Sequence, residues 1–384
     1  MSHLLLPPKA PTVADHVAAP IRDYRPGNVL ISGLDHTLLA RGGLTFTGVS
    51  LAELPGAVAG GLDERGGGVA LGAISFDGQS CRMIFADDVS RYDPLPARPC
   101  FRCGHASWEL VPSPNAAAYV AAVRRARDRI IAGEADKVVL ARALTAISSR
   151  PISLTDLLIH LGGRGRHVYA VPLGRGRSLV GASPELLISR RGRTVTTNPL
   201  AGSARRHPHD PAADLAAADG LLASAKDQRE HHFVVQQVAA ALAPFCDDLQ
   251  VPEQPQVQAT PTLWHLGTTI TATLTDPATT ALHLAAALHP TPAICGTPTA
   301  AARALITELE SGSGVERGWY GGLVGWQDAD GDGEWAITLR CAVVDSRRAR
   351  LWAGAGIIAD SDPEAELAET EAKLATLLHA LHAN

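Results

Sequence analysis

The sequence predicts a mixed α and β fold, and two observations support this prediction. Short runs of alternating or continuous apolar residues, such as 69–76 and 136–144, are typical of strands. Longer segments with the start and stop signals of helices, such as 115–132 and 361–382, lie between such runs. With 384 residues, 46% of them hydrophobic, the chain is long enough for one large domain or two ordinary ones.

Composition and charge argue against several classes of function. The formal net charge of −5 disfavours nucleic acid or an anionic membrane as the main partner. A local basic run, Arg124, Arg125, Arg127 and Arg129, is interpreted as the solvated face of a helix. No apolar run approaches the roughly 20 residues that span a bilayer, and the first residues lack the pattern of an export signal. We therefore expect a cytoplasmic protein with no membrane or nucleic-acid partner.

The six cysteines show no disulfide framework, and we expect free thiols in a reducing compartment. Cys100 and Cys103 form a single C-x-x-C. A zinc site would need a second pair or suitably spaced histidines, which the sequence does not offer.

The N-terminal part, residues 1–112, is rich in Pro, Gly and Ala and carries no motif with assignable chemistry. We expect it to be β-rich and structural. The first clear helix covers 115–132. Ser113 is predicted to cap this helix, Pro114 to lie in its first turn and Gly133 to end it.

Lys137 opens the strand that follows. In a strand it shares one face with Val139 and Ala141, while Val138 and Leu140 line the other face, so both faces are apolar. Burial disfavours a charged amine and lowers its pKa, which would allow Lys137 to accept a proton near neutral pH. The alternative is a lysine at a strand end whose ammonium reaches water, and this run alone leaves both interpretations open.

The middle of the chain predicts a hairpin and a long helix. Residues 181–190 form a predicted strand that turns at Gly192 and returns over 194–197, with Glu185 at the mouth of the hairpin. From 219 to about 245 the pattern predicts one helix, with Lys226, Glu230, Phe233 and Gln237 along one stripe.

Strands are expected again over 260–274 and a helix over 298–310. Two further strands are expected on either side of an Asp-rich turn at 328–333, with Arg340 on the second strand. This turn imitates the first half of a calcium loop, but its twelfth position is Leu339, where a bidentate Glu is required. We interpret it as a polar hairpin turn.

The last helix is predicted to start with a capping box, Ser361-Asp362-Pro363-Glu364, and to continue to about His382. Glu366, Glu369 and Lys373 then fall on one face of this helix. Two carboxylates one turn apart suit a hard cation such as Mg²⁺. The alternative is a solvated face with a Glu369–Lys373 pair.

Seven segments carry a resemblance to a known family. They are 137–142 (KVVLAR), 181–187 (GASPELL), 199–206 (PLAGSARR), 261–266 (PTLWHL), 289–293 (HPTPA), 320–326 (YGGLVGW) and 354–357 (GAGI). With these segments in order, the chain from about residue 115 to its end resembles the chorismate-utilising enzymes, most closely the isochorismate synthases of siderophore pathways. Residues 1–112 match only weakly.

The resemblance implies an α+β fold in which two lobes contribute large antiparallel sheets that face each other, with helices outside. It implies a single chorismate-utilising domain over 1–384, made of a variable N-terminal β-rich part, 1–112, and a chorismate-binding catalytic part, 113–384. We expect a monomer without a glutaminase subunit.

The resemblance also implies roles for individual residues. Lys137 resembles the general base that activates water, and Glu185 the general acid that protonates the departing hydroxyl. The implied Mg²⁺ ligands are Glu230, Glu369 and, through water, Glu366, with Asp227 ordering their surroundings. The implied substrate-binding groups are Gly202, His265, Ala293, Arg340, the Gly356 amide and Lys373.

The implied reaction is the Mg²⁺-dependent isomerisation of chorismate to isochorismate. Ammonia-using relatives usually carry glutamine where Lys137 stands, so lysine favours water. Salicylate synthases, which also eliminate pyruvate, typically have threonine in place of Ala293. The isochorismate could serve a siderophore, salicylate or menaquinone pathway, and the match of 261–266 and 290–293 favours the siderophore-type enzymes.

Two alternatives belong to other classes. A non-catalytic chorismate-binding subunit should have lost the base, the acid or the metal carboxylates, but Lys137, Glu185, Glu230 and Glu369 are all present. A metal-dependent hydrolase built around Glu230-His231-His232 would need H-E-x-x-H spacing, which this segment lacks.

Overall fold

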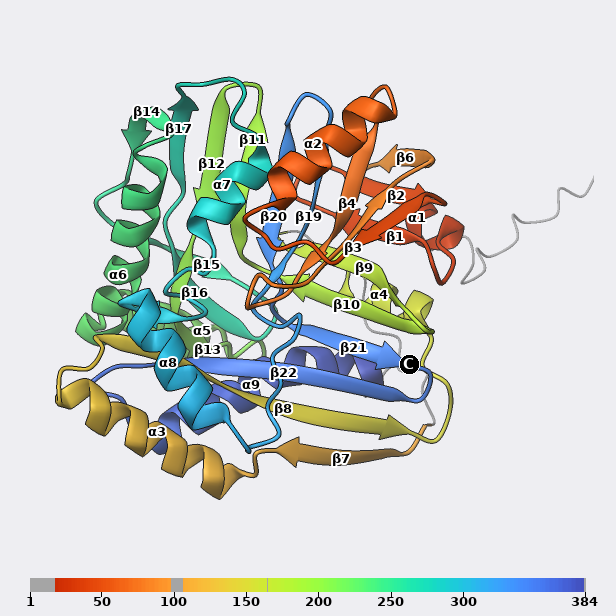
Figure 1. Ribbon diagram of the computed structural model, residues 1–384. Helices are drawn as coiled ribbons and strands as arrows, with labels where there is room; N and C mark the ends of the chain where they lie inside the picture. Colours follow the sequence, from red (N-terminus) through yellow and green to blue (C-terminus); the bar gives the residue numbers. More distant parts are fainter. Residues whose placement is uncertain (1–17, 98–105, 164, 383–384) are drawn as a thin grey trace, which may run out of the picture.

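The computed structural model describes residues 18–97, 106–163 and 165–382. In these residues the strands form three sheets of ten, nine and three strands, with helices on their outer faces (Figure 1). Every pairing between two named strands described there is antiparallel. The predicted α+β class is confirmed. The C-x-x-C of Cys100 and Cys103 lies outside the described residues.

The first sheet contains the first and the last strand of the described residues. In spatial order its strands are β18 (Gly296–Thr297), β8 (Lys137–Ser148), β22 (Arg348–Ile357), β21 (Cys341–Asp345), β10 (Arg177–Ser183), β9 (His167–Gly174), β1 (Val29–Ser32), β2 (Thr37–Arg41) and β6 (Asp88–Tyr92), and β7 (Trp108–Ser113) also pairs with β8.

The other two sheets are built from the remaining strands. The second sheet consists of β14 (Cys246–Gln250), β17 (Ile270–Leu274), β12 (Thr194–Asn198), β11 (Leu186–Arg191), β20 (Gly333–Ile337), β19 (Leu323–Asp328), β4 (Val69–Ile74), β5 (Cys81–Phe85) and β3 (Leu44–Thr47). The third consists of β13 (Leu200–Arg205), β16 (Leu263–Gly267) and β15 (Gln256–Ala259).

The helices of the described residues are α1 (Ala19–Asp23), α2 (Leu54–Glu64), α3 (Ala116–Ile131), α4 (Leu154–Leu161), α5 (Pro211–Ala223), α6 (Ala225–Leu242), α7 (Ala281–Leu288), α8 (Thr299–Glu310) and α9 (Pro363–His382). None of these helices combines the length and the apolar composition that a membrane span requires.

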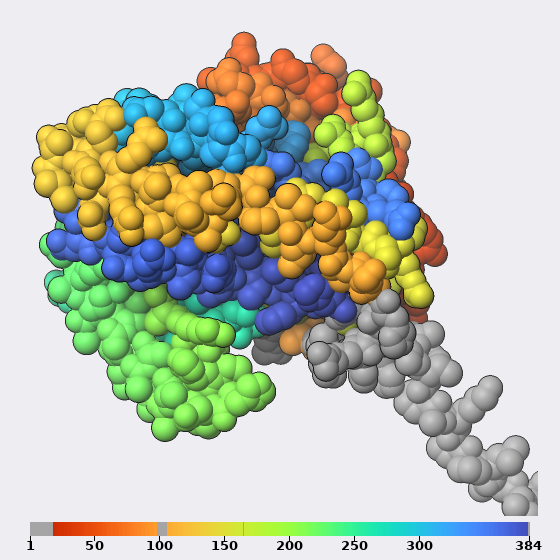
Figure 2. Space-filling view, turned by 90° about the horizontal axis from the view of Figure 1, so that it is seen from below, coloured from red at the N-terminus to blue at the C-terminus, as the bar shows by residue number. Residues whose placement is uncertain are grey.

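The two large sheets pack face to face. One buried apolar cluster joins Ile31 and Tyr169 of the first sheet to Leu71 and Trp326 of the second. The outer face of the second sheet packs on α2, α6 and α7, and the outer face of the first packs on α1, α4 and α9. A fourth cluster holds α3 and α8 against the beginning of β8. In Figure 2, α9 (blue) lies between α3 with β7 (yellow-orange) and the green segment that contains α5 and α6.

The chain crosses between the two large sheets several times, and two of these crossings lie at neighbouring positions. It leaves β10 of the first sheet and enters β11 of the second through Pro184 and Glu185. It returns from β20 to β21 through residues 338–340, where Arg340 has a φ of +46°. The two crossings touch, because the Ala182 N–H donates to Arg340 O at 3.1 Å and the Ile337 N–H donates to Glu185 O at 3.2 Å.

These crossings correct two predictions. The predicted strand over 181–190 is two strands in different sheets, interrupted at Pro184 and Glu185. Arg340 does not lie on the strand after the Asp-rich turn, because β20 ends at Ile337, where the chain leaves that sheet. The period-two pattern of a strand is the same in either sheet, so the pattern does not reveal a change of sheet.

Three helix boundaries also differ from the predictions. The helix predicted over 219–245 is divided into α5 and α6 at Ser224, whose Oγ accepts from the Asp227 N–H and caps α6. Asn115, not Ser113, caps α3, because Ser113 is held in β7 opposite Ala143. At α9, Asp362 Oδ1 accepts from the Ala365 N–H at 2.8 Å, so the capping box predicted at Ser361 is wrong. Polar residues close together compete for the same cap, and the sequence does not show which one wins.

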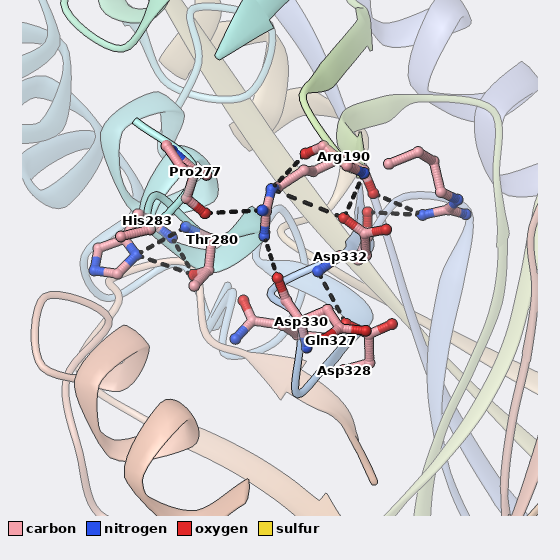
Figure 3. A network of polar contacts seen from close by, with 12 residues as sticks. Arg190, Pro277, Thr280, His283, Gln327, Asp328, Asp330 and Asp332 are labelled. Carbon is pink, nitrogen blue, oxygen red and sulfur yellow. Dashed lines mark hydrogen bonds and ion pairs between the residues drawn. The ribbon is translucent and has the colours of Figure 1, made fainter. Parts of the chain in front are cut away.

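The Asp-rich segment is a hairpin turn between β19 and β20, as predicted. Asp328 Oδ1 accepts from the Asp330 and Asp332 N–H groups, and Asp332 Oδ1 accepts from the Gly192 N–H at 2.7 Å. The buried Arg190 joins this turn to its neighbours by donating to Asp330 O at 2.8 Å and to Pro277 O at 2.9 Å (Figure 3). The aspartates therefore bind backbone amides of the turn.

Candidate active site

A cavity lies where the first and third sheets meet α6, α9 and the two crossings that lead to and from the second sheet. Many of the predicted site residues line it together, although they are far apart in the sequence. These are Glu185, Gly202, Glu230, His265, Ala293, Arg340, Gly356, Glu369 and Lys373.

Three predicted site residues do not line this cavity. Asp227 and Glu366 line a groove between α6 and α9 that shares Ser203 and Glu369 with the cavity. Lys137 lies behind the cavity wall, where its ammonium contacts Glu230.

Lys137 is completely buried, with 0% of its surface exposed. Its Nζ lies 2.9 Å from Glu230 Oε1, and no hydrogen bond satisfies it within the described residues beyond this ion pair. The interpretation in which Lys137 reaches water is therefore wrong. Gly356 packs against this pair: a Cβ on Gly356 would lie 2.5 Å from Glu230 Oε1 and 2.8 Å from Lys137 Cε. The absent side chain at 356 thus leaves room for both groups.

Glu185 is a buried carboxyl group at the crossing from β10 to β11, 3% exposed. Burial raises its pKa to about 7, although the Leu200 N–H, Lys137, Arg340 and Lys373 oppose this rise. A carboxyl group with this pKa holds its proton in a large fraction of molecules near neutral pH. It can therefore donate a proton, which an ordinary glutamate at that pH cannot.

Three acidic side chains of α6 and α9 are each paired with a lysine. Glu366 Oε1 lies 2.7 Å from Lys226 Nζ, and Glu369 Oε1 lies 2.5 Å from Lys373 Nζ, in addition to the Glu230–Lys137 pair.

The pKa values of these acids reflect their surroundings. Burial and the nearby Glu369 raise the pKa of Glu366. Burial would also raise the pKa of Glu230, but Lys137, Lys373 and Lys226 together lower it.

A metal ion is implied by the resemblance, and these carboxylates fit one by their chemistry. All the candidate donors are carboxylate oxygens, which Mg²⁺ prefers, and the repulsion between Glu366 and Glu369 shows that added positive charge would be favourable there. Among residues 18–97, 106–163 and 165–382, no three metal-binding side chains converge as a ligand set, since lysines engage the carboxylates.

His265 is neutral and its tautomer follows from its partners. Burial lowers its pKa well below the usual value, and Arg340 and Lys373 lower it further. Arg340 Nη2 is a donor and lies 3.2 Å from His265 Nε2, so this nitrogen accepts. Nδ1 must then carry the proton and donate to Gly202 O at 3.3 Å. His265 therefore holds the Arg340 guanidinium and the Gly202 backbone together.

Only glycine fits at position 202, for two reasons. Its φ of +75° lies in the left-handed region, and a Cβ there would come within 2.9 Å of Asp227 Cβ. Asp227 thus packs directly beneath the backbone of β13 that lines the cavity.

The sequence reasoning did not assign Ser203, Tyr320 and Trp352, although all three line the cavity. The Ser203 Oγ is buried without a hydrogen-bond partner in the described part of the chain. Tyr320 and Trp352 stack with ring centroids 6.4 Å apart. Ser203 and Tyr320 belong to two of the segments that carry the resemblance, which is a signal that could have identified them.

Comparison with known proteins identifies similar sequences. Residues 102–382 match a family model described as chorismate binding enzyme. The chain is 40% identical over 392 residues to the isochorismate synthase DhbC of Bacillus subtilis (strain 168), which covers 96% of each protein. It is 43% identical over 335 residues to a putative isochorismate synthase, MenF, of Mycobacterium tuberculosis (strain ATCC 25618 / H37Rv), covering 82% of this chain and 86% of that one.

Among solved structures, the chain is similar to a putative 2,3-dihydroxybenzoate-specific isochorismate synthase, DhbC, from Bacillus anthracis. The TM-score is 0.90 with 38% sequence identity, and the match covers 95% of this chain and 99% of that one. The similarity therefore extends over the N-terminal strands as well as the cavity.

Proposed function

The chain belongs to the chorismate-binding enzymes, and from this membership we propose that it is an isochorismate synthase. It isomerises chorismate to isochorismate: water adds at C2 of the ring, the double bonds shift, and the C4 hydroxyl leaves as water. The observation that carries the proposal is that Glu185, a buried acid with a pKa of about 7, shares one cavity with the cations Arg340 and Lys373.

Lys137 and Glu185 are proposed as the base and the acid. The Lys137 nitrogen accepts a proton from the water that forms the C2–O bond. The Glu185 carboxyl group gives its proton to the C4 oxygen as the C4–O bond breaks, because hydroxide is a poor leaving group. Lys137 must leave its contact with Glu230 Oε1 before its nitrogen can act in this way.

Substrate binding requires positive charge, because chorismate carries two carboxylates. Arg340 and Lys373 are proposed to bind one carboxylate together with the Gly356 amide, which offsets the lost hydration of the anion. Gly202, His265 and Ala293 complete the walls of the cavity.

We propose that Glu230, Glu369 and Glu366 hold a Mg²⁺ ion, with Asp227 ordering their surroundings. Bound there, Mg²⁺ would supply positive charge that offsets a carboxylate of chorismate. The assignment is supported by the chemistry of the three side chains, since carboxylate oxygens are the ligands that Mg²⁺ prefers.

The product is proposed to be isochorismate without pyruvate elimination, and the nucleophile to be water. Ala293 contributes no hydroxyl to the cavity, and a lysine stands at position 137. The similarity to DhbC proteins supports a pathway to 2,3-dihydroxybenzoate for a siderophore. The division of the chain at residue 112, the monomeric state and the absence of a glutaminase subunit stay predictions.

One experiment tests the proposed function. The purified protein is incubated with chorismate and Mg²⁺, and isochorismate, salicylate and anthranilate are separated by chromatography, with and without ammonium. Isochorismate alone is expected under both conditions. Salicylate would indicate pyruvate elimination, anthranilate would indicate an ammonia-using enzyme, and no conversion at all would contradict the proposal.

A further inference from the structure

The outer edge of β8 has a gap next to Lys137. β18 pairs with Lys137 and Val138, and β7 pairs with β8 only from Ala143 onward. Within the described residues no strand covers the peptide groups between them. An uncovered buried edge leaves backbone donors and acceptors that need other partners.

A buried ion pair fills this gap. Glu310, the last residue of α8, accepts from the Ala141 N–H through Oε1 at 2.8 Å. Arg317 donates from Nη2 to Val139 O at 2.6 Å. The two side chains are joined by Arg317 Nε to Glu310 Oε2 at 2.9 Å and by Nη2 to Oε1 at 2.6 Å. One acceptor and one donor of a missing strand are thereby replaced by side-chain atoms.

The pair is buried and almost fully satisfied. Arg317 is 6% exposed and Glu310 is 9% exposed. The third Arg317 nitrogen, Nη1, donates to Ile294 O at 2.8 Å, and the guanidinium lies 4.4 Å from the centre of the Phe76 ring. A planar guanidinium with five donors in fixed directions can make these contacts together, which a lysine ammonium cannot.

Each backbone segment that the pair holds adjoins the cavity. The other edge of β8 at Val139 and Ala141 pairs with Gly356 and Gly354 of β22. Ile294 follows Ala293, which lines the cavity. Arg317 O accepts from the N–H of Tyr320, which also lines the cavity, at 2.8 Å. The pair itself does not line the cavity.

We propose that Arg317 and Glu310 are positioning residues for catalysis. They hold β8 in register with β22 at the point where Lys137, Gly356 and Ala293 meet, so that the base keeps its place relative to the substrate. Only the kinetic consequence rests on the proposed function. The structural consequence, the protection of the Ala141 amide, is independent of it.

The test uses Arg317→Lys, which keeps the positive charge but loses the planar set of guanidinium N–H donors. We expect kcat per folded molecule to fall about 10- to 100-fold, because small displacements of reacting groups have effects of this size. The chorismate KM is expected to stay within about twofold, because Arg340 and Lys373 are untouched. Hydrogen exchange of residues 139–141 is expected to become faster.

Arg190→Lys is the matched control. Arg190 is similarly buried and also binds backbone carbonyls, those of Gly192, Pro277 and Asp330, at the far end of the second sheet (Figure 3). This variant should lose thermal stability without a change in kcat or in exchange at residues 139–141. A purely structural role for Arg317 predicts the same behaviour for both variants.

A second pair of variants keeps the test decisive if Arg317→Lys does not fold. Glu310→Gln retains an oxygen that can accept from Ala141, whereas Glu310→Ala does not, so the Gln variant should keep more of kcat and of the amide protection. Equal kcat in the two variants, or unchanged exchange at 139–141 in Glu310→Ala, would overturn the proposal. A wild-type protein that does not convert chorismate would remove the proposed function, but the exchange measurement would still test the pair.

Discussion

Lys137 is fully buried, and within the described residues its one ion pair is with Glu230. In the proposed reaction the amine must separate from Glu230 before it can take a proton from water. Its position behind the cavity wall could not be predicted from the strand pattern, which shows only that both faces of β8 are apolar.

We predict that Lys137→Ala abolishes turnover while chorismate still binds. Loss of a general base commonly costs 10²- to 10⁴-fold, so kcat should fall by about this factor. Steady-state kinetics and calorimetric titration with chorismate measure the two effects separately. Retained activity would remove the assignment of Lys137 as base, and loss of chorismate binding would point to a role in affinity instead.

The pKa of Glu185 predicts the pH dependence of the reaction. Burial raises this pKa to about 7, so the acid form dominates below pH 7 and is lost as the pH rises above it. The value of kcat/KM, which reports the free enzyme, should therefore fall about tenfold per unit above this pH. Glu185→Gln, which has no acidic proton, should be inactive at every pH. A profile that stays flat to pH 9 would contradict the role of Glu185.

At the scale of elements, β22 carries a glycine, Gly356, whose lack of a side chain leaves room for Glu230. We predict that Gly356→Ala lowers kcat by about 100-fold, because its Cβ would lie 2.5 Å from Glu230 Oε1 and displace it. Gly220→Ala in α5 is the control: its Cβ meets nothing within 4 Å, and alanine in a helix should stabilise the protein by roughly 0.5–1 kcal/mol. Equal activity of the two variants would show that the Gly356 contact is unimportant.

The facing helices α6 and α9 carry the proposed metal ligands. We predict that Glu230→Ala and Glu369→Ala each weaken Mg²⁺ affinity by at least about tenfold, measured by titration of Mg²⁺ in the presence of chorismate. Glu364→Ala, on the exposed start of α9, should leave this affinity unchanged. Unchanged magnesium dependence in the Glu230 and Glu369 variants would count against both assignments.

The sequence predicted several of the elements and nine of the residues that line the cavity, but for different reasons. Local patterns located strands such as β8 and helices such as α8, because periodicity depends on neighbours in the chain. The prediction that Glu185, His265 and Arg340 share one cavity came from the resemblance, since no local pattern joins such distant residues. The Arg317–Glu310 pair was not predicted, because its function depends on a gap between two strands that only the folded sheet reveals.

At the scale of the whole molecule, the cavity draws its walls from the first and third sheets, from the two crossings beside the second sheet, and from both α6 and α9. A ligand bound there would contact all of these parts of the chain together. We predict that chorismate with Mg²⁺ raises the melting temperature. At about 100 times the dissociation constant the added stability should be roughly 2.7 kcal/mol. Thermal unfolding at rising chorismate concentration measures it, and a constant melting temperature would argue that this cavity does not bind chorismate.

The two neighbouring crossings between the large sheets place Glu185 and Arg340 side by side, so the alignment of one sheet on the other sets the spacing of these two groups. The hairpin turns at Gly192 and Gly331 lie at the opposite ends of β11 and β20, away from these crossings. A fluorescent label or a fusion partner attached at those turns would therefore report on the protein without disturbing its chemistry.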